Sequence, residues 1–355
     1  MEAKSSIRIK KYIIGWMSIV LFSGCASSKI SIDVLKLPDS PLSQPVRNVA
    51  LVNRVDINSS KTKQFVQGRV VAQYNSITDI MVNETISEME TIFNSNQYFN
   101  AFDTTVSFIP KNGSYGSSPI PVRFVSQMCR SIDADAIVII EGYNAEVDTD
   151  SDVLFSTPVE RTYGTVRVPY FNGEQSVYMQ MLFRAYTCNN GVGKVDTESD
   201  VSTQVSVSAT GSTPYEVNNR IADANNVLVQ AARKLATDYT EQIAPKWETK
   251  SRKIYSTGTE QMKQAYIYAK GGNWSGASDI WYLLATSNNT KLASRATYNL
   301  IVASEISGDI DLALEWANLC VDKFKMDHVK PYIAELKERK EEIIKMEFLF
   351  PELKI

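Results

Sequence analysis

The sequence predicts an α+β protein, with a mixed α/β sandwich domain over residues 47–244 and an all-α, tetratricopeptide-like helical domain over residues 245–347. In the first domain, apolar runs of strand length alternate with segments of helical periodicity in the order β-α-β-α-β. Alternating polar and apolar residues then indicate antiparallel strands, and an amphipathic segment indicates a long closing helix. In the second domain, helical patterns repeat at a fixed offset.

Length and composition favour a globular chain of two domains. The 355 residues are 44% apolar and 22% charged, which is ordinary for globular proteins, and the chain is longer than a typical single domain. Residues 1–24 hold four basic residues and one acidic residue, a net +3, so the rest of the chain carries about −6 of the total −3. Nucleic acid is therefore not an expected partner, because its binding needs a basic surface.

The first 24 residues predict a signal peptide that is cleaved before Cys25. Lys10 and Lys11 precede an apolar run, Tyr12–Phe22, which is shorter than the ~20 residues that span a bilayer but fits the core of a secretory signal. Phe22-Ser23-Gly24-Cys25 resembles the lipobox of bacterial lipoproteins. The resemblance implies acylation at Cys25, which makes the membrane an expected partner. The alternative is an ordinary signal peptide or membrane anchor with an incidental cysteine.

The residues after Cys25 favour a cell-envelope location, at the outer membrane and facing the periplasm. Ala26 stands where an acidic residue would resemble an inner-membrane retention signal. Ser27-Ser28-Lys29 lacks the acidic cluster that resembles surface-export signals in Bacteroidetes lipoproteins. Three further cysteines, Cys129, Cys188 and Cys320, are expected to be buried free thiols. The compartment permits disulfides, but the number is odd and the spacings match no framework.

Residues 25–46 are expected to form a tether, with one short edge strand at 30–34 before a proline-rich stretch. The α/β domain follows. Its first elements, in chain order, are a buried strand at 48–53, a loop at 54–64, a helix at about 77–96, a strand at 102–109, a loop at 112–117, a helix at about 122–132 and a strand at 134–142. The last of these (ADAIVIIEG) is apolar on both faces and is expected to be central.

The remainder of this domain is expected to be antiparallel. Strands at 165–171 and 176–187 flank Asn172-Gly173, a dipeptide typical of a hairpin turn. Residues 201–209 alternate strictly and predict a half-exposed strand. A helix over about 214–243, with Ile221 and Leu235 in its buried stripe, closes the domain.

The helical domain resembles two tetratricopeptide repeats. Gly308 follows Gly272 by 36 residues, close to the ~34 of that repeat, and each glycine stands five residues before an alanine, Ala277 or Ala313. Two unrelated helical hairpins are the alternative. Since two repeats are few for a free-standing array, flanking helices are expected at about 245–256 and after Pro331. Residues 348–355 are expected to form a C-terminal tail.

The first domain's order resembles the α/β domain of several envelope lipoproteins. The residues that carry the resemblance are Val49-Ala50-Leu51-Val52, Tyr98-Phe99 and residues 134–142. The curli-secretion lipoprotein, penicillin-binding-protein activators and the N-terminal domain of the Tol-Pal propeller protein share such a domain. With the lipobox and the repeats, the whole chain is similar to uncharacterised Bacteroidetes lipoproteins. The resemblance implies binding and scaffolding and implies no reaction.

Residues with reactive or metal-binding side chains form no recognisable constellation. His328 is the only histidine, which excludes sites with several histidines and most serine–histidine designs, and it is expected in a solvated turn. Asp148-Thr149-Asp150-Ser151-Asp152 has the opening spacing of a calcium loop. However, Val153 and Val159 replace the required glycine and glutamate, so a solvated acidic loop is expected.

Two charged clusters are expected to be solvated. Glu84, Glu88 and Glu90 lie on one predicted helix, and the first two share a face. Lys246, Lys250, Arg252 and Lys253 are expected to surround a helix end, with partner binding as the alternative. The sequence thus predicts no catalytic residue, no metal site and no cofactor.

These observations favour a lipid-anchored, non-catalytic adaptor that binds an unidentified protein through its repeats and its α/β domain. Asn299 lies on a first helix of a repeat, where such repeats place a peptide-binding polar residue, and it is the candidate binding residue. The alternative is an oligomeric secretion or assembly component resembling the curli-secretion lipoprotein.

Overall fold

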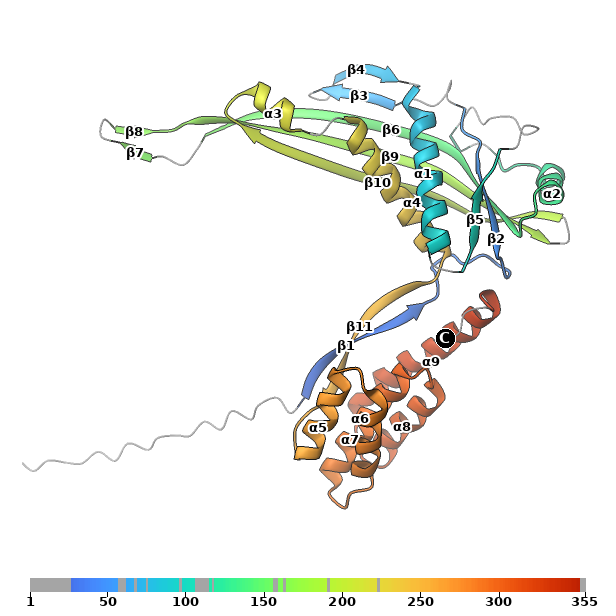
Figure 1. Ribbon diagram of the computed structural model, residues 1–355, viewed down its shortest axis with the longest axis vertical. Coiled ribbons are helices and arrows are strands. Elements are labelled where there is room, and N and C mark those ends of the chain that lie inside the picture. Colours follow the sequence, from blue (N-terminus) through green and yellow to red (C-terminus); the bar gives the residue numbers. More distant parts are fainter. Residues whose placement is uncertain are drawn as a thin grey trace, which may run out of the picture. The chain divides into compact units, whose positions relative to one another are not determined.

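The computed structural model describes residues 27–56, 62–66, 69–74, 76–95, 98–105, 115–116, 118–155, 159–161, 164–189, 192–221 and 224–351 (Figure 1). The chain divides into an α/β unit, Asp33–Thr249 with Lys337–Ile355, and a helical unit, Met1–Ile32 with Lys250–Leu336. A mixed sheet with helices in one unit and packed helices in the other confirm the predicted α+β fold class.

A mixed sheet with the strand order β10-β9-β6-β2-β5 forms the α/β unit. β2 (Asn48–Asn53) is parallel to β5 (Asn100–Asp103) and to β6 (Ala136–Phe155). β6 is antiparallel to β9 (Pro169–Asn189), which in turn is antiparallel to β10 (Val192–Gly211). The strands expected at 48–53 and 134–142 are confirmed, and the second is central because β2 and β9 flank it.

The segment expected to be a loop after β2 contains part of a hairpin. β3 (Thr62–Val66) is antiparallel to β4 (Arg69–Tyr74) and parallel to β6. The hydroxyl oxygens of Thr62 and Tyr143 lie 3.0 Å apart and join β3 to β6. The sequence did not predict this strand because its residues are mostly polar. β3 is held by backbone pairing at the margin of the sheet. β5 ends at Asp103; of the strand expected at 102–109, residues 106–109 lie outside the described residues.

The hairpin expected at Asn172-Gly173 is wrong. Both residues lie inside the continuous strand β9, where Gly173 faces Ser151 of β6 and Ala209 of β10. A Cβ at Gly173 would lie 2.5 Å from Cγ1 of Val217, so glycine is needed for the close approach of a helix. Between β6 and β9, the short strands β7 (Val159–Arg161) and β8 (Gly164–Val166) pair with each other.

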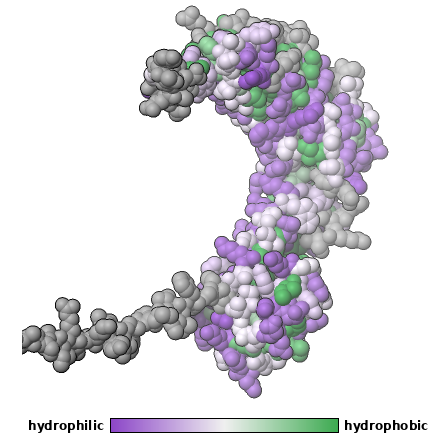
Figure 2. Space-filling view, turned by 60° about the vertical axis from the view of Figure 1, so that its left-hand side comes forward, coloured by the Kyte–Doolittle hydropathy of each residue, from purple (hydrophilic) through white to green (hydrophobic). Residues whose placement is uncertain are grey.

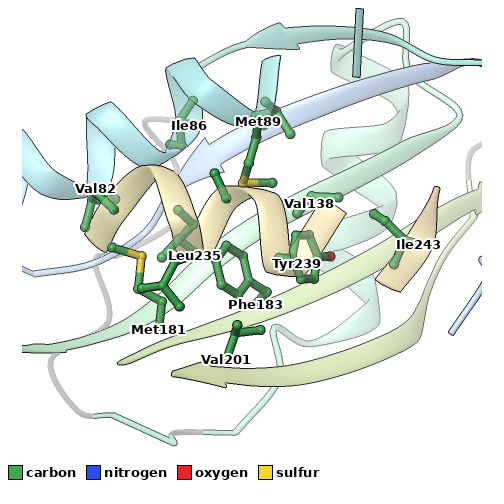
Figure 3. Close-up of a cluster of buried hydrophobic side chains, with 14 of the residues drawn as sticks. Val82, Ile86, Met89, Val138, Met181, Phe183, Val201, Leu235, Tyr239 and Ile243 are labelled. Carbon is green, nitrogen blue, oxygen red and sulfur yellow. The ribbon is translucent and has the colours of Figure 1, made fainter. Parts of the chain in front are cut away.

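Helices α1 (Ser76–Ser95) and α4 (Ala224–Ile243) cover one face of the sheet (Figure 3). Figure 3 shows Val82, Ile86 and Met89 of α1 beside Leu235 and Tyr239 of α4, above the sheet residues Val138, Met181, Phe183 and Val201. The rings of Phe183 and Tyr239 stack with centroids 4.1 Å apart. The stripes predicted from helical periodicity therefore form this core.

The single helix expected over 214–243 is instead two helices. α3 (Pro214–Arg220) ends where Ile221 adopts an extended conformation, with φ −65° and ψ 129°. The short helix packs where glycines leave space: Val217 approaches Gly173 and Gly211 of the sheet. Helical periodicity continued through Ile221, so the sequence pattern did not reveal the break.

The opposite face of the sheet carries α2 (Val122–Ser131), whose Val125 and Met128 pack on Ala50, Val52, Ile137 and Ile139. Here the expectation of free thiols is wrong for Cys129 and Cys188, which form a disulfide that joins α2 to β9. The two cysteines are 59 residues apart, and only the packing of α2 on the sheet brings them together. Cys320 is buried and free, as expected.

The helical unit contains the expected hairpins. The helices are α5 (Glu260–Lys270), α6 (Trp274–Ala285), α7 (Thr290–Ile306), α8 (Ile310–Asp322), the 3-10 helix η1 (Asp327–Val329) and the start of α9 (Lys330–Leu349). Gly272 and Gly308 both have a φ of 82°, which favours glycine. Asn273 and Asp309 then cap α6 and α8. The two copies thus share one turn and one capping scheme.

The helix expected over 245–256 is wrong, because this segment forms the strand β11 (Lys246–Tyr255), which pairs with β1 (Ser27–Lys36). β1 includes the short strand expected at residues 30–34 of the tether and is longer at both ends. Arg252 and Ile254 of β11, and Ser256 directly after it, are buried at a period of two, so the inward positions include a charged residue. At the other end of the chain, Leu349 and Phe350 pack into the core of the α/β unit.

We predict that the double variant Cys129→Ser/Cys188→Ser loses about 4 kcal/mol of α/β-unit stability, because a bridge across 59 residues restricts the unfolded chain. Thermal unfolding followed by circular dichroism should show a midpoint roughly 10 °C lower. A reductant should lower the midpoint of the unaltered chain and leave that of the double variant unchanged. Equal midpoints for the unaltered chain with and without reductant would contradict the disulfide.

Candidate functional site on the inner face of the helical repeats

The helical unit encloses a buried arginine clamp. The guanidinium of Arg252, on β11, forms paired hydrogen bonds with two carboxylates. Its Nε and Nη2 donate to Glu305 of α7 at 2.8 and 2.7 Å, and its Nη2 and Nη1 donate to Glu335 of α9 at 2.9 and 3.2 Å. The Glu305 side chain is fully buried and that of Arg252 is 10% exposed. Paired geometry of this kind suits a guanidinium and not an ammonium group.

Aromatic rings complete the clamp. The guanidinium of Arg252 lies 4.9 Å from the ring centroid of Tyr332, and the Tyr332 hydroxyl donates to Glu305. Burial and the nearby Glu305 carboxylate raise the pKa of Tyr332 well above its usual value, so its hydroxyl keeps its proton. Burial alone would raise the pKa of Glu335, but hydrogen bonds from Arg252 and Lys250 outweigh burial and lower it. Glu335 is therefore held as a carboxylate.

Asn299 contacts the next part of the same strand. Its Nδ2 donates to the carbonyl oxygen of Tyr255 at 2.8 Å, and its Oδ1 accepts the backbone N–H of Tyr255 at 2.8 Å. The rings of Tyr255 and Tyr298 meet edge to face, with centroids 5.2 Å apart. Asn299 is fully buried. The Asn299 amide thus bonds to an extended backbone that belongs to the chain itself, and its role in binding a partner stays a prediction.

Together these contacts hold an extended segment of the chain itself, in which an arginine and a tyrosine stand three positions apart. The carboxylates of Glu305 and Glu335 bond to the guanidinium, the Asn299 amide bonds to the backbone, and the Tyr298 ring packs on the tyrosine. We call Arg252–Tyr255 the resident segment. The sequence had indicated Asn299, but Arg252, Glu305, Glu335 and Tyr332 were missed. Glu305 and Glu335 lie in helical patterns where a glutamate is ordinarily solvated, and only the three-dimensional packing shows that they face Arg252.

The other residues singled out from the sequence lie apart from this site or beyond the description. Cys25 lies outside the described residues. His328 is exposed on η1 and its ring lies 6.2 Å from that of Tyr298, so its solvated position is confirmed. The acidic run Asp148–Asp152 is wrong as a loop because it lies within β6. In the part of the chain that the structure describes, no three histidine, cysteine or acidic residues are placed to hold a metal ion.

The two charged clusters also have definite positions. Glu84 and Glu88 of α1 share one face and both approach Arg233 of α4, at 2.7 and 3.7 Å. The expected helix end around the basic residues 246–253 is wrong, since they lie along β11. Lys246 pairs with Glu241 at 3.2 Å, and Lys250 pairs with Glu335 at 3.1 Å.

A second buried charge cluster lies in the α/β unit. Glu141, fully buried at a β-bulge in β6, accepts hydrogen bonds from Arg54 at 3.0 Å, from Tyr186 at 2.8 Å and from Arg184. Arg184 in turn donates to Glu198 at 2.6 Å. These contacts join β6, β9 and β10 to the end of β2. In the sequence, the only feature that pointed to this cluster was Glu141, a charged residue inside the apolar run 134–142.

The family comparison decides the membership of the chain. A family model described as Domain of unknown function (DUF8603) matches residues 46–255, more than half of the chain. The chain belongs to this family. A second model, Domain of unknown function (DUF6340), matches residues 263–338. The DUF8603 match ends at Tyr255, so it includes the resident segment, whereas α7 and the start of α9 lie in the DUF6340 match.

Two solved structures show remote similarity to this DUF8603 protein. One is described as a neuraminyllactose-binding hemagglutinin homolog from Helicobacter pylori, with 10% identity and a TM-score of 0.24, covering 59% of this chain and 88% of that one. The other is the hypothetical protein CT253 from Chlamydia trachomatis, with 11% identity and a TM-score of 0.23, covering 54% and 95%. Similarities this remote carry no argument about function. No curated protein matches the chain.

Two observations bear on location. None of the helices among the described residues is sufficiently long and apolar to cross a membrane. The Cys129–Cys188 disulfide is typical of an oxidising, extracytoplasmic compartment.

We predict that Arg252→Met lowers the stability of the helical unit by about 3–5 kcal/mol, because it leaves Glu305 buried without its cation. Urea unfolding followed by tryptophan fluorescence is a suitable measurement, since Trp274, Trp281 and Trp316 lie in the helical unit. Arg252→Lys should also destabilise, through lost paired hydrogen bonds. The double variant Arg252→Met/Glu305→Gln should recover part of the loss; an unchanged midpoint for Arg252→Met would contradict the clamp.

Proposed function

We propose that this protein is a lipid-anchored, non-catalytic envelope adaptor, attached through Cys25 to the outer membrane, facing the periplasm and binding another protein. The observation that carries the proposal is the exposed apolar surface on α6 and α8 of the helical unit, because the inner site is filled by the resident segment. The similarity to uncharacterised Bacteroidetes lipoproteins is part of this proposal.

Because the resident segment already fills the inner site, a partner protein needs another surface of the helical unit. Exposed apolar side chains lie on α6 and α8. Tyr282 is 58% exposed, Leu283 is 71% exposed, and the rings of Tyr282 and Trp316 meet at 6.1 Å. Figure 2 shows hydrophobic residues between polar ones on the surface of the helical unit. Rigid aromatic side chains of this kind are enriched in protein interfaces.

One observation favours the second candidate, an oligomeric assembly component. β10 is the last strand of its sheet, and its residues Val201–Gly211 contain no charged residue and no proline. Such an edge lacks the usual protection against pairing with another strand. An antiparallel match of two copies about Val205 would pair the uncharged residues 201–209 with one another, with no like charges in register. The occupant that this edge fits is therefore a second copy of the chain.

The first prediction of this proposal concerns the lipid anchor. Cys25→Ser should abolish incorporation of labelled palmitate in cells and should move the protein from the membrane fraction to the soluble periplasmic fraction. Cys320→Ser is the matched control, because that thiol is buried, and it should leave both results unchanged. Persistent labelling of the Cys25→Ser protein would contradict lipid attachment at this residue.

The second prediction concerns the protein partner. A photo-crosslinking residue at Leu283 should capture one distinct protein in cells, and capture should fall when Tyr282 is changed to Ser. A crosslinker at Ser206, which is exposed on β10, should give no adduct with a second copy if the adaptor proposal holds. Adducts of the chain with itself from Ser206, without a distinct protein from Leu283, would replace the adaptor by the oligomeric candidate.

A further inference from the structure

The start of β1 ties the beginning of the described chain to one end of the helical unit. The hydroxyl oxygens of Ser28 and Ser256 lie 3.0 Å apart, and Ser256 follows the resident segment. Ser28 is three residues after Cys25. Three residues span at most roughly 10 Å, so a lipid attached at Cys25 would be tethered to Ser28 by no more than this length of backbone.

A depression opens beside Ser256. It has a volume of about 490 Å³ and a mainly apolar lining of Ser256, Thr257, Gly258, Thr259, Lys263, Tyr266 and Ile267. Ile267 is 51% exposed and adds an aliphatic side chain to this apolar lining. Lys263 lines the same depression, and a lysine can pack its aliphatic stem on apolar groups while its ammonium reaches polar ones.

Cations gather around the same depression. Lys29, next to Ser28, is exposed. Lys253 and Arg295 lie 4.8 and 5.4 Å from the ring centroid of Tyr255, and Arg295 donates to the carbonyl oxygen of Thr257 at 3.4 Å. Glu260 is the carboxylate that pairs with Lys263, at 3.6 Å. Among these described residues, four cations therefore stand against one carboxylate.

We propose that this anchor-side surface, defined as Lys29, Ser256–Thr259, Lys263, Tyr266 and Ile267, lies against the membrane and binds anionic phospholipids. The basic residues contact the phosphate groups, and Tyr266 with Ile267 enters the interfacial layer. The position of Cys25 brings this end of the unit to the bilayer, and the charges then fix its orientation. The inference rests on the proposed lipid anchor and adds the face that the helical unit turns to the lipid.

The test uses the full-length lipidated protein in vesicles that contain phosphatidylglycerol. A polarity-sensitive dye is attached at Ile267→Cys or, as a matched control on the same unit, at Leu283→Cys. Cys129 and Cys188 are bonded to each other, and burial raises the pKa of Cys320 to about 12, so the new thiol reacts selectively. The dye at position 267 should shift to the blue and be quenched by a lipid-borne quencher, while the dye at position 283 should not.

Charge variants complete the test. Lys29→Gln/Lys263→Gln should reduce the quenching at position 267 to the level seen on neutral phosphatidylcholine vesicles, because two basic residues together change the affinity for an anionic surface about 30-fold. Lys345→Gln, which removes an exposed charge from α9 in the other unit, should have no effect. Vesicle-bound protein with equally unquenched dyes at both positions would overturn the membrane contact and leave the anchor intact. Protein that does not float with vesicles would overturn the anchor itself.

Discussion

The guanidinium of Arg252 lies between the carboxylates of Glu305 and Glu335, and the arrangement of the helical unit depends on it. Without a cation between them, the fully buried carboxylate of Glu305 and that of Glu335, whose side chain is 35% exposed, would repel each other. Arg252 comes from a strand, so the same contact that stabilises the helices fixes β11 on their inner face. Asn299 and Tyr255 then extend this fixation along the backbone.

This constraint changes what the repeats are expected to do. A pair of tetratricopeptide-like hairpins ordinarily offers an inner surface to a partner. In this chain the inner surface already holds the resident segment, which belongs to the DUF8603 match, while the helices that hold it belong largely to the DUF6340 match. We therefore propose the exposed residues of α6 and α8 for partner binding, and the anchor-side surface for membrane binding.

Most helices and strands were predictable, because the spacing of apolar residues along the sequence shows which side chains are buried. The stripes of α1 and α4, the alternation in β10 and the repeated Gly272 and Gly308 turns are local patterns, and the structure follows them. Three errors share one physical cause. Each error concerns residues whose structure depends on a neighbour distant in sequence. Gly173 lies against Val217, and Arg252 of β11 pairs with glutamates of α7 and α9. The two bonded cysteines meet through the contact between α2 and β9. The candidate site was therefore found only at Asn299.

Native-state hydrogen exchange of the unaltered protein tests the central claim most directly. The Tyr255 amide donates to the Asn299 side chain, so it should exchange only when the helical unit opens, with the same opening free energy as the amides in the middle of α7. Exchange of the Tyr255 amide at nearly the rate of an unprotected peptide, while α7 stays protected, would show that the resident segment is not held. That result would contradict the account of the clamp and of the filled inner face.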